Sequence, residues 1–539
     1  MRPARPLVVG DHLGGHHAAA DARSAVLHRD HHAGDEDRAP LEVRVIRAVA
    51  LRSLEERGCG GAQRLEPADV AVDAVGSAAE LVDRAIVRGD ERAHLVFVDL
   101  PFEAERENPS GATTIDAPRH GWTVPPRYER RQDGSARLKT RTECAFVMIP
   151  SRYLDSTAAR AAHGDRVDRL APFLTKADPL ADDVVRDVIR GLPPGQGWAQ
   201  IERVLRDGVA NVPDAHPAVR ALFESVEHVP AWVDWKVIDR AGSLLLRTGW
   251  FGGLVLGIQS LPYGYASPGG NKPLAFSGRL REQAPRRLTE TARFVHTVCL
   301  PGEVHPGREG FSITLKVRLM HAQVRRLLWD SGKWNRNAWG EPINQHDMAA
   351  TTMLFSIVVL DGIRKLGFRV SRDEAEDYVQ LWRYVGWLMG SSEELLPTSE
   401  REAHRLADLI MATQAPPDDD ARALTKALLD SGRQAARTED ELRQVERLKY
   451  FTLAVSWRLL GEELASQLAV PRSPLEPLFP LLRGAIGAVE RVRRLSPRLT
   501  SIAVRQGDVY WKKLIDDGLR GKPADFHPPT SLAGRTATA

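Results

Sequence analysis

The chain has 539 residues, of which 43% are hydrophobic and 27% charged, as in proteins that fold around apolar cores. Its formal net charge of +3 is close to balanced, so composition gives no reason to expect binding to nucleic acid or to an acidic membrane surface. Cys59, Cys144 and Cys299 lie far apart, which excludes a CxxC metal or redox pair. Their odd number argues against a disulfide framework and favours a reducing, cytoplasmic compartment.

Residues 1–147 form the first segment, where Gly, Pro and charged residues are frequent and no hydrophobic period is sustained. We predict a poorly structured N-terminal extension. Its six histidines between His12 and His32 could bind a metal, although they imply no fixed geometry. Because the sequence after Met148 resembles a natural protein start, an over-extended reading frame is an equal alternative. No apolar run of signal-peptide length is present at this end.

Residues 148–530 are predicted to form one all-α domain, with a clear helical period from about residue 175. "DPLADDVVRDVIRGL" has an acidic first turn and a glycine stop, and Pro230 separates two later helices. Further helix starts are marked by cap residues: Ser277, Asn344 with Asp347, and Ser371 with Glu374. Residues 531–539 are predicted to be a disordered tail.

Two apolar stretches, Gly249–Ala266 and Met348–Ile363, raise the question of a membrane span. The first contains Pro262 and several glycines, and the second is bounded by Asp347 and Asp361. Both are too short or too broken to cross a bilayer, so we expect buried core and no transmembrane segment.

Common enzyme signatures are missing, including GxSxG, GxxxxGK[ST], GxGxxG after a strand and HExxH. A di-iron bundle would need Glu-x-x-His on two helices. The nearest pair, Glu400 and His404, is one residue too wide. A ferritin-like metal site is therefore not expected.

The segment "KVRLMHAQVRRLL" places Arg318, His321 and Arg325 on one face of an otherwise apolar helix. Two nearby cations would lower the pKa of His321, and a neutral imidazole is the form that binds metal. The arginines could also pair with two carboxylates of a cofactor. The apolar neighbours predict a largely buried helix whose polar strip finds its partners inside the fold. An ordinary surface strip of ion pairs with acids from another helix is the competing interpretation.

Several motifs in order around this helix resemble one family, the latex-clearing proteins (rubber oxygenases) and the mycophenolic-acid pathway oxygenase MpaB. They are "YGYASPGGNKPLAFSGRLREQAPRRLTETARFV", "RLMHAQVR", "WGEPINQHDMAATTMLFS" and "YVQLWRYVGWLMG", and the resemblance covers about residues 225–400. It implies a helical fold with a globin-like core that binds haem b. It also implies that His321 is the proximal iron ligand, flanked by Arg318 and Arg325 as in the family's R-x-x-H-A-x-x-R pattern.

The resemblance further implies a distal helix, on which this chain carries Arg287, Glu290 and Thr291 as its catalytic candidates. Arg and Thr agree with the rubber oxygenases, but Glu290 stands where they have a Lys that can cap the iron. This protein should therefore not share that closed state. Glu290 could act as a base instead, or it could form an i, i+4 pair with Arg286. The family's own catalytic glutamate cannot be placed.

Other aromatic and histidine residues fit the same helices less well. His296 lies nine residues after Arg287 and is an alternative axial ligand, and His346 is expected in a capping turn. The apolar stripes around "MLFSIVVL" and "VGWLMG" could line a substrate channel, but simple core is favoured. Core positions are also expected for Tyr378, Trp382 and Trp387.

Together these features predict a cytoplasmic, haem b-dependent oxygenase acting with dioxygen on a small apolar substrate, possibly isoprenoid in class. Two alternatives stay open: a haem-binding sensor or carrier without turnover, and a cofactor-free helical interaction protein. The substrate, the catalytic base, any redox partner and the oligomeric state do not follow from the sequence.

Overall fold

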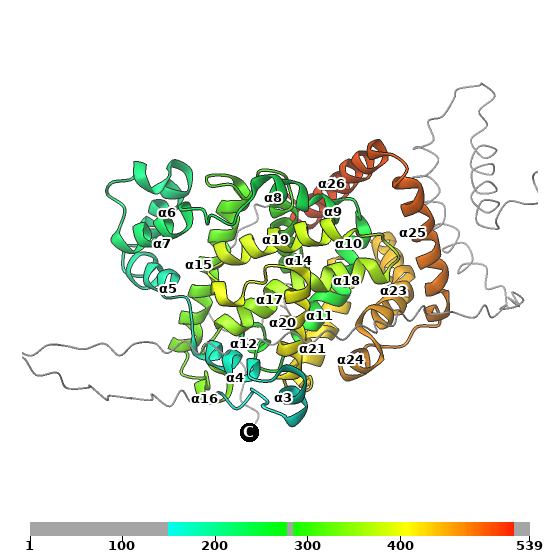
Figure 1. Ribbon diagram of the computed structural model, residues 1–539, viewed down its shortest axis with the longest axis horizontal. Helices are drawn as coiled ribbons and strands as arrows, with labels where there is room; N and C mark the ends of the chain where they lie inside the picture. The colour runs from blue at the N-terminus through cyan, green and yellow to red at the C-terminus, as the bar shows by residue number, and fades with distance from the viewer. Residues whose placement is uncertain (1–148, 278–283, 522–539) are drawn as a thin grey trace, which may run out of the picture. The chain divides into compact units, whose positions relative to one another are not determined.

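The computed structural model of the chain describes residues 149–277 and 284–521, and every regular element in these ranges is helical (Figure 1). One isolated bridge joins Tyr153 and Gln414. The prediction of an all-α body is therefore confirmed. The predicted N-terminal extension at 1–147, with its histidine cluster, and the predicted tail at 531–539 lie outside the described residues.

The helices before the histidine-bearing segment are mostly short. They are α3 (Thr157–His163), α4 (Arg166–Leu170), α5 (Pro179–Val184), α6 (Gln196–Asp207), α7 (Pro217–Glu227), α8 (Trp235–Ala241), α9 (Ser243–Leu246), α10 (Trp250–Val255), α11 (Leu261–Tyr265), α12 (Lys272–Ser277) and α14 (Ala284–Val298). Two π-helical turns, η3 (Val185–Ile189) and η5 (Leu256–Ser260), extend α5 and α10.

The later helices are longer and include those that carry the site and its support. They are α15 (Glu309–Asp330), α16 (Arg336–Trp339), α17 (Gln345–Phe355), α18 (Ile357–Lys365), α19 (Arg372–Leu388), α20 (Glu400–Ala412), α21 (Asp419–Leu429), α22 (Ser431–Ala435), α23 (Glu439–Leu460), α24 (Glu462–Gln467), α25 (Phe479–Arg493) and α26 (Pro497–Leu519).

Side-chain caps explain where several of these helices begin. Ser371 and Glu374 form the predicted capping box of α19, and the Asn344 side chain accepts from the Asp347 amide at the start of α17. Asp178 caps α5 in the same way. Ser277 is the last residue of α12, and its predicted role as an N-cap concerns residues 278–283, which lie outside the described residues.

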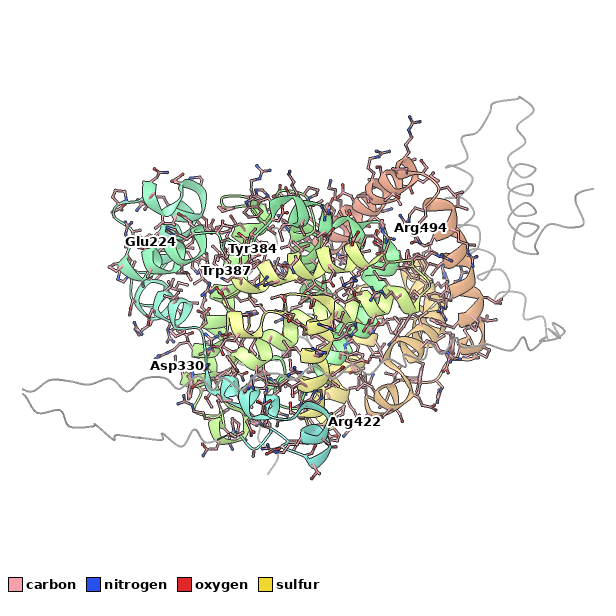
Figure 2. All side chains as sticks on the ribbon, viewed as in Figure 1. Glu224, Asp330, Tyr384, Trp387, Arg422 and Arg494 are labelled. Atoms are coloured by element: carbon pink, nitrogen blue, oxygen red, sulfur yellow. The ribbon has the colours of Figure 1, made fainter. Side chains whose placement is uncertain are left out.

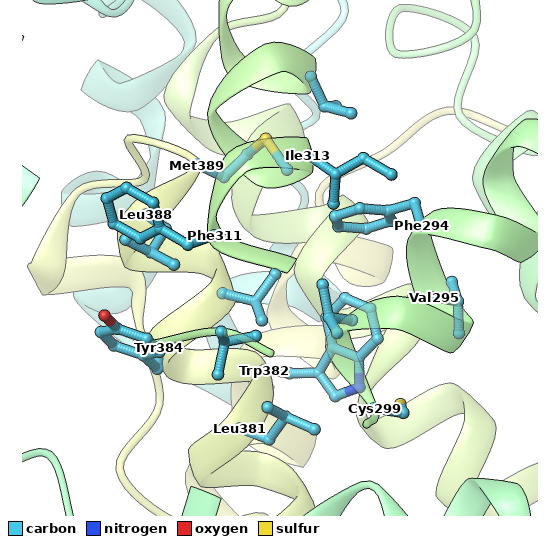
Figure 3. Packing of buried hydrophobic residues seen from close by; sticks show 14 of the residues in the cluster. Phe294, Val295, Cys299, Phe311, Ile313, Leu381, Trp382, Tyr384, Leu388 and Met389 are labelled. Atoms are coloured by element: carbon cyan, nitrogen blue, oxygen red, sulfur yellow. The ribbon is translucent and has the colours of Figure 1, made fainter. Parts of the chain in front are cut away.

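The core forms where α14, α15 and α19 pack together (Figure 3). Trp382 of α19 is its largest buried side chain, stacked on Phe355 at 4.9 Å and edge-on to Phe294 of α14 at 6.2 Å between ring centres. Tyr378 is equally buried, which confirms both residues as core, and Trp387 packs against the same cluster. The stripes "MLFSIVVL" and "VGWLMG" also lie mainly within this packing, as the core interpretation predicted.

The two apolar stretches belong to broken helices. Met348–Ile363 is divided at Ser356, where the backbone (φ −98°, ψ −89°) separates α17 from α18. By length and composition alone, Gln345–Lys365 is the one described segment that could cross a membrane, and 61% of its apolar window is buried. A second would arise only if Trp235–Leu246 and Trp250–Tyr265, bent by 88°, counted as one span.

A glycine allows the last long helix to approach the chain closely. A Cβ added to Gly507 of α26 would lie 1.6 Å from the Leu246 carbonyl oxygen of α9. Only a residue without a side chain fits at this distance. The contact positions α26 against α9, and α26 also packs along α14, which bears the predicted distal residues.

Candidate functional site

Helix α15 carries the three residues singled out from the sequence, and it packs against α5, α14 and α19. Arg318 and Arg325 are buried, with 5% and 3% of their surface exposed. The prediction of a largely buried helix with a polar strip is therefore confirmed. A buried cation is stable only when it is paired and hydrogen-bonded, so the partners of this strip decide its role.

Arg318 is paired within the chain. Its Nε and Nη2 donate to the two carboxylate oxygens of Asp178, at 2.7 and 2.9 Å, and its Nη1 donates to the Leu388 carbonyl oxygen at 3.2 Å. This two-pronged geometry is the strongest form of an arginine–carboxylate pair. Asp178 thus both caps α5 and neutralises Arg318.

Arg325 is paired on the same side of α15. Its guanidinium forms an ion pair with Asp182 of α5 and donates to the carbonyl oxygens of Pro342 at 3.0 Å and Ile343 at 3.1 Å. Acids from another helix therefore satisfy both arginines, as one interpretation of the sequence predicted. That interpretation placed the strip at the surface, however, whereas it is buried. Direct binding of a cofactor carboxylate by either arginine stays a prediction.

His321 is the member of the strip that has no partner among the described residues. Its Nδ1 is fully enclosed and makes no hydrogen bond. Its Nε2 also makes none, yet this nitrogen is not enclosed, and the residue keeps partial exposure on a buried helix. The Nε2 edge of the ring is therefore accessible, whereas the Nδ1 edge is not.

The surroundings keep this imidazole neutral. Burial, together with the positive charges of Arg325 and Arg287, lowers the pKa of His321 to about 4, while Asp178 opposes them. At neutral pH the ring has a lone pair available for a metal. The expected direction of the pKa shift is thus confirmed, although burial contributes more than the arginines.

The predicted distal residues lie on α14, which packs against α15. Arg287 is close enough to influence both His321 and the buried Tyr265, whose pKa is raised by burial and lowered by this arginine. Thr291 donates its hydroxyl to the Arg287 carbonyl oxygen at 2.9 Å. Among the described residues of α14, Arg287 is therefore the one whose positive charge lowers the pKa of His321.

Glu290 forms the i, i+4 pair that was one of its two sequence interpretations. Its Oε1 accepts from Arg286 Nε at 3.0 Å. Its role as a catalytic base stays a prediction.

The other histidine candidates have partners. His296, the alternative axial ligand, shares a 2.8 Å hydrogen bond through Nε2 with Asp508 of α26. His346 lies in the first turn of α17, as expected, although Asn344 is the cap itself. His404 Nε2 lies 3.8 Å from Glu400 Oε1. Within the described residues, no group of three His, Cys, Asp or Glu side chains could hold a metal ion.

Three residues near the strip were not identified from the sequence: Asp178, Asp182 and Tyr265. The acidic first turn of "DPLADD" was visible, but its partner more than 130 residues away was not. A separate pocket of about 190 Å³ between α11, α17, α18 and α20 is lined by His404 and Asp361 and by none of the six predicted site residues.

A haem group fits the donor chemistry of these residues. Haem iron needs one neutral imidazole with a free nitrogen, and His321 offers it on a helix fixed at both sides by ion pairs. Proximal histidines usually donate their second nitrogen to a carbonyl or carboxylate, and the enclosed Nδ1 of His321 lacks that partner. The fit therefore rests on the neutral ring and its open edge.

In the described residues, the fold and this site together define a helical domain in which a neutral histidine without a hydrogen-bond partner lies on a buried helix. Residues 235–491 match the family described as "ER-bound oxygenase mpaB/B'/Rubber oxygenase, catalytic domain". The match covers just under half of the chain, and the resemblance inferred from the sequence motifs is confirmed. His321, Arg287, Glu290 and Thr291 all fall inside the matched region.

Two known proteins show the extent of the similarity. A rubber oxygenase of Streptomyces sp. (strain K30) is 25% identical over 280 residues, which cover 51% of this chain and 66% of that protein, just under two thirds. The structure of latex clearing protein LCP in the closed state aligns with a TM-score of 0.48 and 22% identity, over 63% of this chain and 88% of the other.

Proposed function

We propose that the chain is a haem b-dependent oxygenase, located in the cytoplasm, that acts with dioxygen on a small apolar substrate of the isoprenoid class. The observation that carries the proposal is His321, a neutral, unpartnered imidazole on a helix inside the family's catalytic domain. The family consists of oxygenases, and a relative is named for rubber, a polyisoprene.

The residues have separate tasks in this proposal. His321 holds the iron through its open ring edge, while Arg318 and Arg325 fix α15 through Asp178 and Asp182. Haem supplies the activation of dioxygen when it is bound. Arg287 keeps a positive charge near the site, and the apolar core around Trp382 excludes water.

The test is to express the full chain with haem supplied, record the visible spectrum and measure haem b as its pyridine haemochrome. We expect one haem per chain and its loss in His321→Ala. His296→Ala is the matched control, because His296 is a buried histidine of the neighbouring helix α14 that is bonded to Asp508, and this variant should keep the haem. A His321→Ala protein with an unchanged spectrum refutes the site.

Turnover is tested separately, by oxygen consumption with short isoprenoids. Stoichiometric haem without oxygen consumption would assign the chain to the sensor or carrier class. Folded but colourless protein from haem-supplied cells would favour a cofactor-free interaction protein. Arg287→Gln should keep the haem and lower the rate, because Arg287 is the described distal-helix cation whose charge reaches His321.

A further inference from the structure

Helix α25 presents an apolar stripe to solvent. On α25, Leu481 and Val492 are 64% and 37% exposed, with Ala485 and Ala488 between them at helical spacing, and Leu495, in the turn that follows the helix, is 81% exposed. Soluble proteins expose single apolar residues often, but a continuous stripe along one helix usually marks a contact surface. We therefore expect a binding partner to cover this stripe.

The stripe is accompanied by positive charge. Between residues 477 and 507 the chain contains six arginines and a single acid, Glu490. Five of the arginines are exposed: Arg483, Arg491, Arg494, Arg498 and Arg505. Arg494 stands where α25 meets α26 (Figure 2). By helical periodicity, Arg491 lies at one border of the stripe, whereas Arg483 lies on the opposite side of α25; the arginines that accompany the stripe are therefore Arg491 and those at the turn between α25 and α26, Arg494 and Arg498.

The opposite face of α25 holds the stripe in its outward position. Ile486 is buried against the main core. Glu490 is 3% exposed and accepts from Arg247 Nη1 at 3.0 Å and from Arg493 Nε at 2.7 Å. The one acid of the segment is thus paired inside the protein. A rotation of α25 that buried the apolar stripe would break the hydrogen bonds of Glu490 with Arg247 and Arg493.

We propose that α25 and the start of α26 form a docking surface for an anionic lipid bilayer. Leucines at the exposed face of a helix insert into the boundary between headgroups and acyl chains, and arginines along the border reach the phosphates. The surface has no exposed acid of its own to repel the lipid. Two copies of this chain meeting through the same surface would instead bring the exposed arginines of both turns between α25 and α26 together.

The experiment is sedimentation of the full chain with vesicles made of equal parts phosphatidylcholine and phosphatidylserine, and with vesicles of phosphatidylcholine alone. We expect binding to the first that weakens as salt is raised. Each arginine near an anionic surface contributes about fivefold, so Arg494→Gln with Arg498→Gln should weaken binding about 25-fold. Leu481→Ser with Leu495→Ser should weaken it at least about tenfold.

Helix α20 offers the matched control, because it exposes Arg401, Arg405 and Met411. Arg401→Gln with Arg405→Gln, and Met411→Ser, should leave vesicle binding unchanged. All the substituted side chains are exposed, and equal thermal midpoints verify that the variants fold. Because vesicle binding needs neither haem nor turnover, its outcome is independent of the proposed oxygenase activity.

Three results would overturn the proposal. One is no binding to either vesicle. Another is binding that the α25 variants and the α20 controls reduce equally, or not at all, which would place the lipid contact elsewhere. The third is a dimer of the unsubstituted chain that Leu481→Ser with Leu495→Ser converts to monomer, which would make the stripe an interface between copies.

Discussion

Replacing Asp178 with asparagine should destabilise the protein by about 3 kcal/mol, because Arg318 would stay buried without its counter-charge. The two side chains are only 9% and 6% exposed, so water cannot replace the lost carboxylate. Asparagine is nearly the same size and still caps α5, so the loss reports the ion pair and not the cap, whose removal would add about 1 kcal/mol.

Urea unfolding of four proteins measures this effect: the unsubstituted chain, Asp178→Asn, Arg318→Met and the double variant. In the Arg318→Met background, Asp178→Asn should cost about 1 kcal/mol or less, since no buried cation remains. Asp165→Asn is the surface control, because its pair with Arg169 is largely exposed and contributes about 0–1 kcal/mol. Equal losses for Asp178→Asn and Asp165→Asn would refute the reasoning.

Three further predictions concern pH, a second ion network and two glycines. The pKa of His321 is lowered from 6.5 to about 4, so on acidification this histidine takes up its proton in the unfolded chain before it does so in the folded chain. The free energy of unfolding should therefore fall by an amount approaching about 3 kcal/mol between pH 6.5 and pH 4. Urea midpoints should show this loss for the native chain and lack it in His321→Gln; parallel curves would contradict it. Glu490→Gln should lower stability by about 2–4 kcal/mol, since Arg247 stays buried with half its charge partners gone; an unchanged thermal midpoint would oppose this. Gly507→Ala should lower that midpoint strongly by clashing with a backbone carbonyl, whereas Gly484→Ala, with open space around it, should add about 0.5–1 kcal/mol; the reverse order would refute the packing argument.

Local signals explain which parts of the fold could be predicted. The capping box of Ser371 and Glu374 and the cap at Asn344 depend on residues three positions apart, so sequence alone reveals them.

The site could be predicted only where its geometry follows helical spacing. The shared face of Arg318, His321 and Arg325 and the pair of Arg286 with Glu290 are set by positions within one helix. The pairs with Asp178 and Asp182 join residues about 140 positions apart. The sequence around an arginine does not indicate which distant acid will pair with it. Tyr265 was missed for the same reason.

Net charge was a poor guide to surfaces. The near-neutral total of +3 argued against an acidic membrane partner, yet residues 477–507 carry exposed arginines with their one acid buried. Acids elsewhere on the chain balance the sum without screening this surface, because exposed charges act over roughly 10 Å. Local charge therefore has to be judged after the burial of each acid is known.

The pairing of α5 with α15 also sets the limits of the smallest chain that can fold. The family match begins at residue 235, but the acids that neutralise Arg318 and Arg325 stand at 178 and 182. A chain trimmed to 235–491 would keep the two buried guanidiniums and lose both counter-charges. This loss would destabilise the fold by several kcal/mol, whereas the whole free energy of unfolding of a typical protein is about 5–15 kcal/mol. The unit of sequence similarity is thus smaller than the unit of folding, and the histidine helix belongs to a domain that starts no later than Asp178.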